Sequence, residues 1–285
     1  MPLVTSMEIL GPARAGGYAV GAFNCVNIEF ARAVLGAAEE TRQPVIVAVT
    51  SGAAKYAGWD ALPAAVLGMA REASVPVCLH LDHGTSLGEV EQALRAGFSS
   101  VMIDASMLPS EENIRLTRAA ADLAHAAGVP IEAELGQIGG KEEDIVSGGV
   151  LTNPDDVPRF VSESGLDFLA VAFGSVHQKE RRDAVLDLEL VGRIGRLTGV
   201  PLVLHGGSGV PFGSVRAAIA RGVAKVNVGT ELMRTFSRTL RHTLETRPGE
   251  WDARKLLAPS TAAARAVVLE RIGVFSGKAD IGEEG

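Results

Sequence analysis

Short apolar segments alternate with longer amphipathic segments along the whole chain. Eight apolar segments are mostly continuous hydrophobic runs, which is the pattern of parallel strands that are buried on both faces. Four of them open with a proline, a residue that a strand accepts at its first position. The predicted strands are Tyr18–Phe23, Pro44–Val49, Pro76–Leu81, Ser100–Ala105, Pro130–Leu135, Asp167–Phe173, Pro201–Leu204 and Lys225–Val228.

The amphipathic segments between these strands predict helices. Many are followed by a glycine, which accepts the left-handed backbone that commonly ends a helix: Gly97, Gly128, Gly165, Gly199 and Gly222. The predicted helices are Ile28–Glu40, Ala61–Ala73, Leu87–Ala96, Glu111–Ala126, Asp155–Ser164, Leu188–Leu197, Phe212–Ala220 and Glu231–Arg247.

A strand followed by a helix therefore recurs about eight times, with short connections and no linker. We predict one domain over residues 1–285, a (β/α)8 TIM barrel, because about 250 residues is the usual size of that fold. An open, doubly wound sheet is the alternative fold. Two segments lie outside the repeat: a glycine-rich acidic loop at Gln137–Thr152, and a C-terminal helix and tail at Pro259–Gly277 with Ser260 as its N-cap.

Composition narrows the class of protein. The 285 residues include 27 Lys and Arg against 34 Asp and Glu, a net charge of −7, which argues against broad nucleic-acid binding. No apolar run approaches the roughly 20 residues of a membrane span, and no secretory signal is visible. Two cysteines, Cys25 and Cys78, are too few for a disulfide framework. We therefore predict a globular, cytoplasmic protein with no membrane or nucleic-acid partner.

Ionisable residues gather at the carboxyl ends of the predicted strands, where a TIM barrel carries its chemistry. Three of them are histidines: His83, His177 and His205. A lone histidine at such a position is usually a hydrogen-bonded core residue, but three on one rim favour a metal site. Three imidazoles with an open fourth position are the arrangement of catalytic zinc.

Carboxylates are interleaved with these histidines. Asp82 precedes a proposed ligand and could exchange a proton with a substrate oxygen. Asp104 and Glu134 could orient the histidines or hold a second metal position, and a structural ion pair in the barrel mouth is the alternative. His80, two residues before Asp82, either supports the site or is a core histidine. His125 and His242 fall on predicted helices and are expected to be solvated.

Two glycine-containing turns follow strands seven and eight, the usual phosphate site of this barrel. The first contains Gly206, Gly207 and Ser208, and the second spans Asn227, Val228, Gly229 and Thr230. Backbone N–H groups in such turns, together with a helix N-terminus, bind anions. Neither turn matches a dinucleotide or nucleoside-triphosphate motif. We therefore expect a phosphorylated small-molecule substrate.

A further loop, Gly139–Asp144, combines glycines with a dense run of acidic residues. Such a run is usually a solvated, mobile loop. In a barrel it can also close over the site and bring in a base.

Together these residues resemble the class II (zinc-dependent) ketose-bisphosphate aldolases, a family that includes fructose- and tagatose-bisphosphate aldolases. The similarity runs nearly end to end. It rests on the segments Tyr18–Asn24, His80–His83, Ser100–Ser106, Glu132–Gly136, Leu204–Gly209, Lys225–Glu231 and Phe275–Lys278.

The resemblance implies a role for each candidate residue. His83, His177 and His205 would bind the catalytic zinc, and Asp82 would be the proton donor at the bond that breaks or forms. Glu142 would move the proton on the carbon of dihydroxyacetone phosphate. Asp104 and Glu134 would lie near a second metal position, and the segments Gly206–Ser208 and Asn227–Thr230 would grip the phosphate. The family also implies homo-oligomers, as dimers or tetramers, and a place in sugar breakdown such as glycolysis.

The chain departs from the family at two places. Gln178 stands where the family has a glycine whose backbone serves the phosphate and a monovalent cation (Na⁺ or K⁺). The residues after it, 179–182, lack the usual aromatic side chain. Gly229 stands where many fructose-bisphosphate members have Asp or Asn and many tagatose-bisphosphate members have Ala. The sequence therefore does not identify which sugar is the substrate.

Four other functions remain possible on the sequence alone. One is an aldolase for another phosphorylated keto sugar, such as 6-phospho-5-dehydro-2-deoxy-gluconate. The second is a zinc hydrolase in which Asp82 activates metal-bound water. The third is a Schiff-base aldolase that uses Lys225. The last is a phosphosugar-binding protein without catalytic activity, and the replacement of the family glycine by Gln178 is the reason to consider it.

Overall fold

The structure of the chain is a computed structural model that describes residues 2–142, 145–179 and 181–278, with only the backbone of Glu142 and Ile145. Within these residues, eight parallel strands close into a barrel in the order β1-β10-β9-β8-β5-β4-β3-β2. The closed barrel confirms the predicted (β/α)8 fold and excludes the open sheet. The barrel strands are β1 (Val20–Asn24), β2 (Val45–Thr50), β3 (Val77–Gly84), β4 (Ser100–Ile103), β5 (Ile131–Leu135), β8 (Phe168–Val171), β9 (Leu202–Leu204) and β10 (Val223–Val228).

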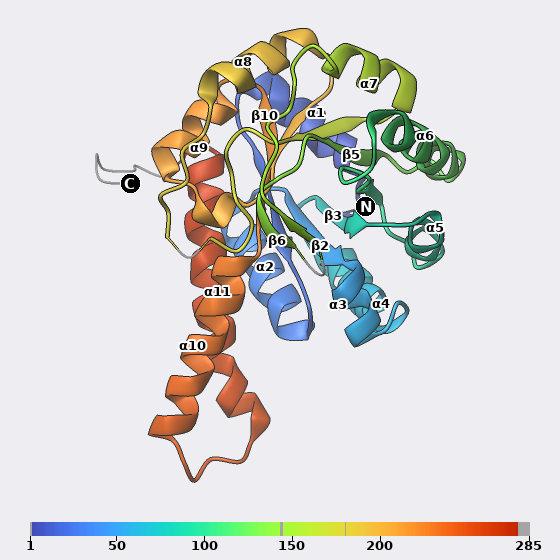
Figure 1. Ribbon diagram of the computed structural model, residues 1–285. Helices are drawn as coiled ribbons and strands as arrows, with labels where there is room; N and C mark the ends of the chain where they lie inside the picture. The colour runs from blue at the N-terminus through green and yellow to red at the C-terminus, as the bar shows by residue number, and fades with distance from the viewer. Residues whose placement is uncertain (1, 143–144, 180, 279–285) are drawn as a thin grey trace.

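Helices surround the barrel on its outside (Figure 1). They cover the outward-facing side chains of the strands, which are therefore apolar, as the continuous hydrophobic runs predicted. The helices are α1 (Ser6–Gly16), α2 (Ile28–Thr41), α3 (Ser51–Ala57), α4 (Ala61–Glu72), α5 (Leu87–Arg95), α6 (Ser110–Ala126), α7 (Val157–Ser164), α8 (Leu188–Leu197), α9 (Phe212–Ile219), α10 (Thr230–Thr246) and α11 (Ala253–Phe275).

Apolar side chains fill the barrel interior at the end where the strands begin. Ile46, Met102 and Phe168 come from different strands and are fully buried there, and Ile9 and Leu10 of α1 pack onto the same cluster. A larger apolar cluster lies between the strands and the outer helices. The barrel is thus a packed core and not a pore, and its polar residues are confined to the layers above.

The termini of the predicted strands and helices agree with the structure to within a few residues. The four prolines that were expected to open strands lie one residue before the first paired residue, for example Pro76 before Val77. Proline has no N–H to donate, but its carbonyl can accept: Val45 donates its N–H to the Pro76 carbonyl at 3.1 Å. Gly199 follows an extended Thr198 at the end of α8 and does not adopt the left-handed backbone expected of it.

The predicted start of the C-terminal helix, at Pro259, was wrong. Helix α11 begins at Ala253 with Asp252 as its N-cap, and the Asp252 side chain accepts a hydrogen bond from the Arg254 N–H. Pro259 and Ser260 therefore lie inside the helix. A proline forfeits only one backbone hydrogen bond, and the packing of Leu257 against the core holds this part of the helix in place.

Two helices and one two-stranded hairpin escaped prediction. Helix α1 contains Pro12 and glycines that obscure its periodicity, and α3 is only seven residues long. The expected loop Gln137–Thr152 contains an antiparallel hairpin of β6 (Gly140–Glu142) and β7 (Ile145–Ser147). Such short elements are stabilised by tertiary contacts, which local patterns do not reveal.

Helices α10 and α11 form a long hairpin that projects from the barrel (Figure 1). Its base packs on α2, and Arg265 of α11 donates a hydrogen bond to the Gly36 carbonyl of α2. Across the described ranges, no helix has the length and apolar character needed to cross a membrane.

Candidate active site at the carboxyl ends of the strands

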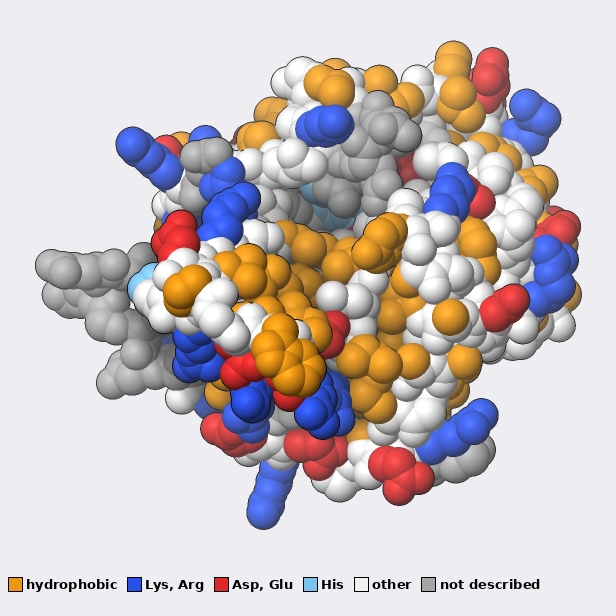
Figure 2. All heavy atoms as spheres, turned by 90° about the horizontal axis from the view of Figure 1, so that it is seen from below, with side chains coloured by type: hydrophobic (Ala, Val, Ile, Leu, Met, Phe, Trp, Pro, Cys, Tyr) orange, Lys and Arg blue, Asp and Glu red, His pale blue; other side chains and the backbone are white. Residues whose placement is uncertain are grey.

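A cavity of about 470 Å³ opens at the carboxyl ends of the barrel strands. Residues from β1, β3 and β10 and from the loops after β8 and β9 line it, among them Asn24, Asp82, His177, Ser208 and Asn227. Viewed from the side toward which the α10–α11 hairpin projects, a hollow is visible with histidine at its floor (Figure 2). Several of the polar strand-end residues found in the sequence therefore meet at one cavity.

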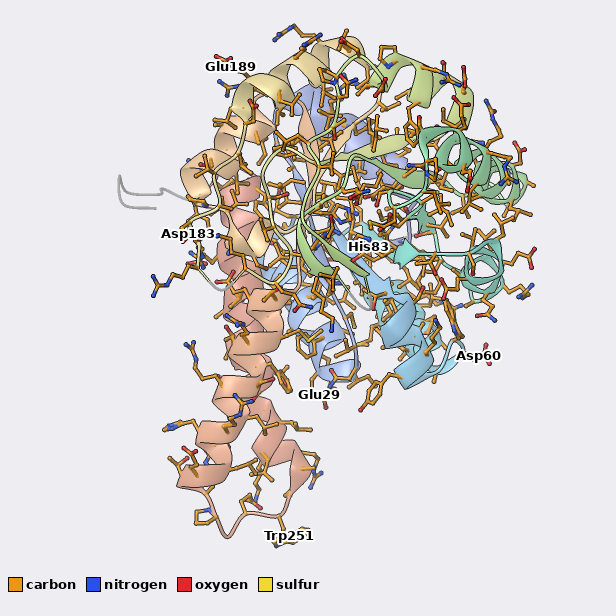
Figure 3. The ribbon with its side chains drawn as sticks, in the orientation of Figure 1. Glu29, Asp60, His83, Asp183, Glu189 and Trp251 are labelled. Atoms are coloured by element: carbon orange, nitrogen blue, oxygen red, sulfur yellow. The ribbon has the colours of Figure 1, made fainter. Side chains whose placement is uncertain are left out.

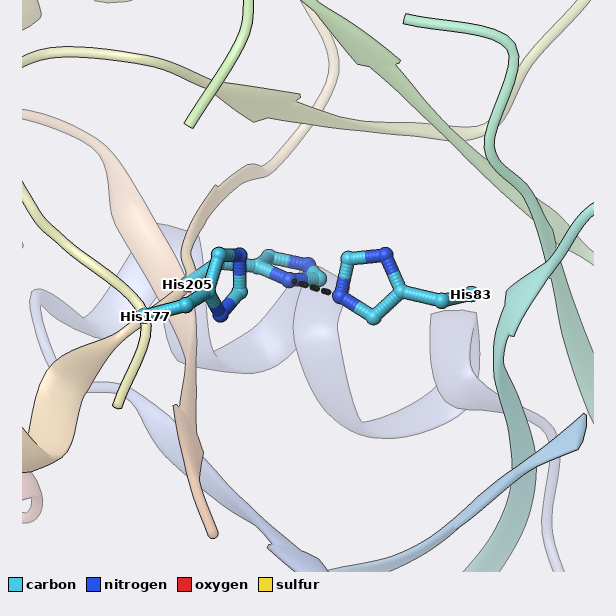
Figure 4. A group of neighbouring side chains, drawn as sticks. All are labelled: His83, His177 and His205. Carbon is cyan, nitrogen blue, oxygen red and sulfur yellow. Dashed lines mark hydrogen bonds between the residues drawn. The ribbon is translucent and has the colours of Figure 1, made fainter. Parts of the chain in front are cut away.

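His83, His177 and His205 lie together at this end of the barrel (Figure 4). Their ring centroids are 4.7 to 5.8 Å apart, and each pair of rings meets edge to face. Each histidine has one ring nitrogen that lies within 4.8 Å of a ring nitrogen of each of the other two. His83 and His205 are buried, and His177 is partly exposed.

The hydrogen bonds of two of these rings show how well the group fits a metal ion. His83 Nδ1 lies 2.8 Å from Asp104 Oδ2, and His205 Nε2 lies 2.7 Å from Glu132 Oε1. A carboxylate only accepts, so these two nitrogens carry the protons. The other nitrogens, His83 Nε2 and His205 Nδ1, face each other at 2.9 Å. Lone pairs directed at one point are what a metal ion requires, so the residues fit a metal centre.

A bulge at the end of β3 brings Asp82 and His83 into the same cavity. Successive side chains of a regular strand point to opposite faces, yet both of these residues line the cavity. The register between β3 and β4 shifts between Leu81 and Gly84, and His83 has a left-handed backbone with φ of 50°. A left-handed residue other than glycine is strained by about 1–2 kcal/mol, and such strain clusters at functional sites.

Asp82 is held by two side-chain amides. Asn24 Nδ2 donates to Asp82 Oδ2 at 3.1 Å, and Asn227 Nδ2 donates to Asp82 Oδ1 at 3.0 Å. Burial alone would raise the pKa of Asp82, but its interactions with His83 and Lys225 outweigh it and lower the pKa to about 2. The carboxylate is therefore ionised, and its two amide partners fix its orientation in the cavity.

Asp104 and Glu134 form a second group with His83, beside a small cavity of about 20 Å³. Burial opposes ionisation of Asp104, but its hydrogen bond to His83 lowers its pKa below the usual range. Burial and the charge of Asp104 raise the pKa of Glu134 well above its ordinary value. Glu134 Oε2 is buried and has no hydrogen-bond partner among the described residues. An unpartnered buried oxygen beside two candidate ligands suits a second cation position.

The two glycine-containing turns pack backbone to backbone at the cavity wall. A Cβ atom on Gly207 would lie 2.8 Å from the Asn227 carbonyl oxygen, so only glycine permits this approach. Ser208 accepts a hydrogen bond from the Glu231 N–H at 3.3 Å, which ties the first turn to the N-terminus of α10. The following residues of the predicted set line the cavity: Gly206, Ser208, Asn227, Gly229 and Thr230. Gly207 and Val228 lie behind that lining.

Gln178 also lines the cavity, and its φ is 55°. The left-handed backbone explains why the resembling family carries glycine here: the conformation is retained, and the glutamine bears the strain. Nearby, the His177 N–H donates to the Gly139 carbonyl at 2.8 Å and fixes the His177 loop to the β5–β6 connection. Glu142 belongs to β6, but its side chain lies outside the described residues.

His80 lies below the cavity and is fully buried. Its Nδ1 atom lies 2.8 Å from Ser100 Oγ, and its Nε2 atom lies 3.4 Å from Glu132 Oε2. It is thus a buried supporting residue that does not line the cavity. His125, on helix α6, pairs with Asp167 at 2.9 Å and is about half exposed.

Sequence reasoning missed two of the residues that complete the site. Asn24 was noted only as part of a motif, although a polar residue ending an apolar strand is itself a signal. Glu132 likewise entered only as part of a motif, although a carboxylate within an apolar strand is a signal of the same kind. Lys225 was considered as a Schiff-base nucleophile, but it is fully buried, pairs with Glu132 at 2.6 Å and does not line the cavity. That alternative does not fit the geometry.

Comparisons with known proteins identify the family of the chain. The family model described as fructose-bisphosphate aldolase class-II matches residues 4–279. The chain is 44% identical over 285 residues to the fructose-bisphosphate aldolase of Geobacillus stearothermophilus, which covers 98% of this chain and 99% of that protein. It is 44% identical over 299 residues to the fructose-bisphosphate aldolase of Thermus caldophilus, covering 96% and 98%. The crystal structure of the YdjI aldolase from Escherichia coli K12 matches with a TM-score of 0.85, 34% identity, and 98% and 100% coverage.

Proposed function

The chain belongs to the class II fructose-bisphosphate aldolase family and is therefore a lyase, and from this premise we propose its substrate, metal and catalytic residues. The substrate is a ketose 1,6-bisphosphate of the fructose or tagatose type. The enzyme cleaves it reversibly to dihydroxyacetone phosphate and glyceraldehyde 3-phosphate. One observation carries this proposal: two of the three grouped histidines, His83 and His177, line the same cavity as the two glycine-containing turns, and His205 lies directly behind them.

The metal we propose is zinc, held by His83, His177 and His205. Imidazole nitrogens suit zinc, and no cysteine lies among the candidate ligands. The chemistry that zinc supplies when bound is Lewis-acid polarisation of the ketose carbonyl. Asp104 orients His83, and Glu134 offers its unpartnered oxygen to a second cation position.

In the cleavage direction, Asp82 accepts the proton of the hydroxyl beside the scissile bond, and in the condensation direction it returns that proton. Its two amide partners hold both carboxylate oxygens, so the reacting oxygen needs little reorganisation. The turns Gly206–Ser208 and Asn227–Thr230 bind the phosphate of dihydroxyacetone phosphate through backbone N–H groups and the α10 N-terminus. By the family resemblance, Glu142 moves the proton on the dihydroxyacetone phosphate carbon.

Cleavage assays on a panel of sugar phosphates test the proposal. Fructose 1,6-bisphosphate and tagatose 1,6-bisphosphate are compared with 6-phospho-5-dehydro-2-deoxy-gluconate, each with chelator, with zinc restored, and with Na⁺ or K⁺ varied. We expect cleavage of a ketose bisphosphate that the chelator abolishes and zinc restores. Chelator-resistant cleavage, or covalent trapping of substrate by borohydride, would contradict the zinc mechanism.

Two other outcomes of the same panel identify the alternatives. If kcat/KM is at least tenfold higher for the deoxy-gluconate than for either ketose bisphosphate, the deoxy-gluconate is the substrate instead. Binding without any cleavage would indicate a phosphosugar-binding protein, and release of inorganic phosphate would indicate a hydrolase.

We also propose that the chain functions as one catalytic domain in a cytoplasmic homo-oligomer, a dimer or a tetramer, in sugar breakdown. Cys25 and Cys78 are both free, as in a reducing compartment. Trp251 lies at the tip of the projecting α10–α11 hairpin and is 88% exposed (Figure 3). An exposed tryptophan on a projecting element favours contact with another subunit. Light scattering of the intact protein and of Trp251→Ala measures the oligomeric state.

A further inference from the structure

A chain of buried polar side chains lies beneath the histidine group. Glu132 of β5 and Lys225 of β10 are both fully buried, and Lys225 Nζ donates to Glu132 Oε2 at 2.6 Å. The other oxygen, Glu132 Oε1, lies 2.7 Å from His205 Nε2. One carboxylate therefore joins the lysine to a candidate metal ligand. The proposed reaction uses neither Glu132 nor Lys225 directly.

The same lysine is held from its other side by His80. His80 Nδ1 lies 2.8 Å from Ser100 Oγ, and the Ser100 hydroxyl donates to Ser6 Oγ at 3.0 Å. Ser100 Oγ therefore accepts the Nδ1–H of His80, which leaves His80 Nε2 as an acceptor. That nitrogen lies 3.4 Å from Lys225 Nζ. The ammonium thus has two acceptors in fixed positions, Glu132 and His80.

The geometry of His205 depends on where Glu132 points. Since a carboxylate only accepts hydrogen bonds, Glu132 Oε1 places the proton of His205 on Nε2 and leaves the Nδ1 lone pair facing His83. Lys225 is the cation that contacts Glu132 within the described interior. A buried carboxylate without a cation is costly and would not keep this position.

We propose that Lys225 is a positioning residue for the metal centre: by holding Glu132, it keeps the Nδ1 atom of His205 directed at the ion. This inference rests on the proposed metal centre. It assigns to the lysine a task in metal binding and none in bond cleavage.

If Lys225 acted only through its charge, its removal would change the zinc affinity in the opposite direction. Removing a buried cation near a metal site removes repulsion and would tighten the binding of a divalent ion. Removing a positioning residue would loosen it, because outer partners of metal-ligating histidines typically contribute 10- to 100-fold in metal affinity. The direction of the change in the metal dissociation constant therefore separates the two effects.

The experiment measures zinc affinity by competition with a chromophoric chelator, and the visible spectrum of the cobalt-substituted protein. Lys225→Met is expected to raise the zinc dissociation constant about 10- to 100-fold and to change the cobalt spectrum. Lys255→Met is the control, since Lys255 pairs with Glu250 on the surface of the α10–α11 hairpin. An unchanged or lower dissociation constant in Lys225→Met would overturn the inference.

A double-mutant cycle tests the route through Glu132. In a Glu132→Gln background, Lys225→Met is expected to change the zinc dissociation constant by less than about twofold, because the two changes remove the same interaction. An equal loss in both backgrounds would show that the lysine acts independently of Glu132. The double variant buries no unpaired charge, so it provides a folded protein if Lys225→Met alone is too unstable.

The wild-type protein separates this inference from the proposed function. If the wild type binds no zinc, the proposed metal centre fails and the inference with it. If the wild type binds zinc and cleaves its substrate while Lys225→Met binds zinc equally well, only the inference fails.

Discussion

Replacement of Gly229 by alanine is expected to disturb Asp82 through Asn24. Gly229 is the N-cap of α10, and its φ of −123° is open to any residue, so the backbone does not require glycine. The neighbouring side chain does require it, because a Cβ atom built there lies 2.6 Å from Asn24 Oδ1 and 3.0 Å from Asn24 Cγ. Gly229 therefore contacts Asn24, the residue that donates a hydrogen bond to the proposed catalytic Asp82.

The size of the effect follows from the distances. Ordinary contact begins at about 3.4 Å, so the Asn24 side chain must move by about 0.8 Å. Its hydrogen bond to Asp82 is already 3.1 Å long, and such a movement breaks it. A hydrogen bond to a charged group contributes about 1.5–3 kcal/mol. Since 1.36 kcal/mol is a factor of ten in rate, we expect kcat to fall about 10- to 100-fold with a smaller change in KM.

The assay follows release of dihydroxyacetone phosphate through a coupled NADH-dependent reduction. Gly68→Ala on α4 is the control, because a Cβ atom there meets nothing within 4 Å. In an Asn24→Ala background, Gly229→Ala should have little further effect. A wild-type kcat in Gly229→Ala, or a full additional loss in the Asn24→Ala background, would refute the reasoning.

Three further predictions concern metal binding, backbone strain and thiol reactivity. His205→Ala should abolish both zinc binding and turnover, measured by metal analysis and the cleavage assay, and full zinc occupancy would contradict the ligand assignment. Gln178→Gly should raise the free energy of unfolding in urea by about 0.5–1 kcal/mol, because it relieves a left-handed backbone at some entropic cost; a decrease would contradict this. Burial raises the pKa of Cys25 and Cys78 to about 12, so iodoacetamide at pH 8 should modify them only after unfolding. Mass spectrometry of native protein measures this, and rapid native modification would refute it.

Much of the fold could be predicted because its signal is local. A continuous apolar run such as Val45–Thr50 has to be covered on both faces, and its alternation with amphipathic helices leaves few architectures. The helices that escaped prediction, α1 and α3, are those in which proline, glycine or short length weakens the periodicity. Pro259 misled the prediction of α11 because tertiary packing overrode a local helix-breaking signal.

The site was predictable in part for a related reason. His205 and Asn227 end apolar strands, and a polar residue there has no role in the core, so it attracts attention. The hydrogen bonds that complete the site were not predictable. Asn24, Glu132 and Lys225 come from three different strands, and their hydrogen bonds depend on distances that no spacing along the chain encodes.

The sequence by itself determined the alternation of strands and helices, the rim on which the polar residues gather, and the family. Only the tertiary structure decided how those residues meet. The bulge at His83 turns two successive side chains into one cavity, and closure of the barrel brings β5 and β10 close enough for Glu132 and Lys225 to pair. Hydrophobic periodicity is a local property of the chain, whereas bulges and buried ion pairs arise from long-range packing and register.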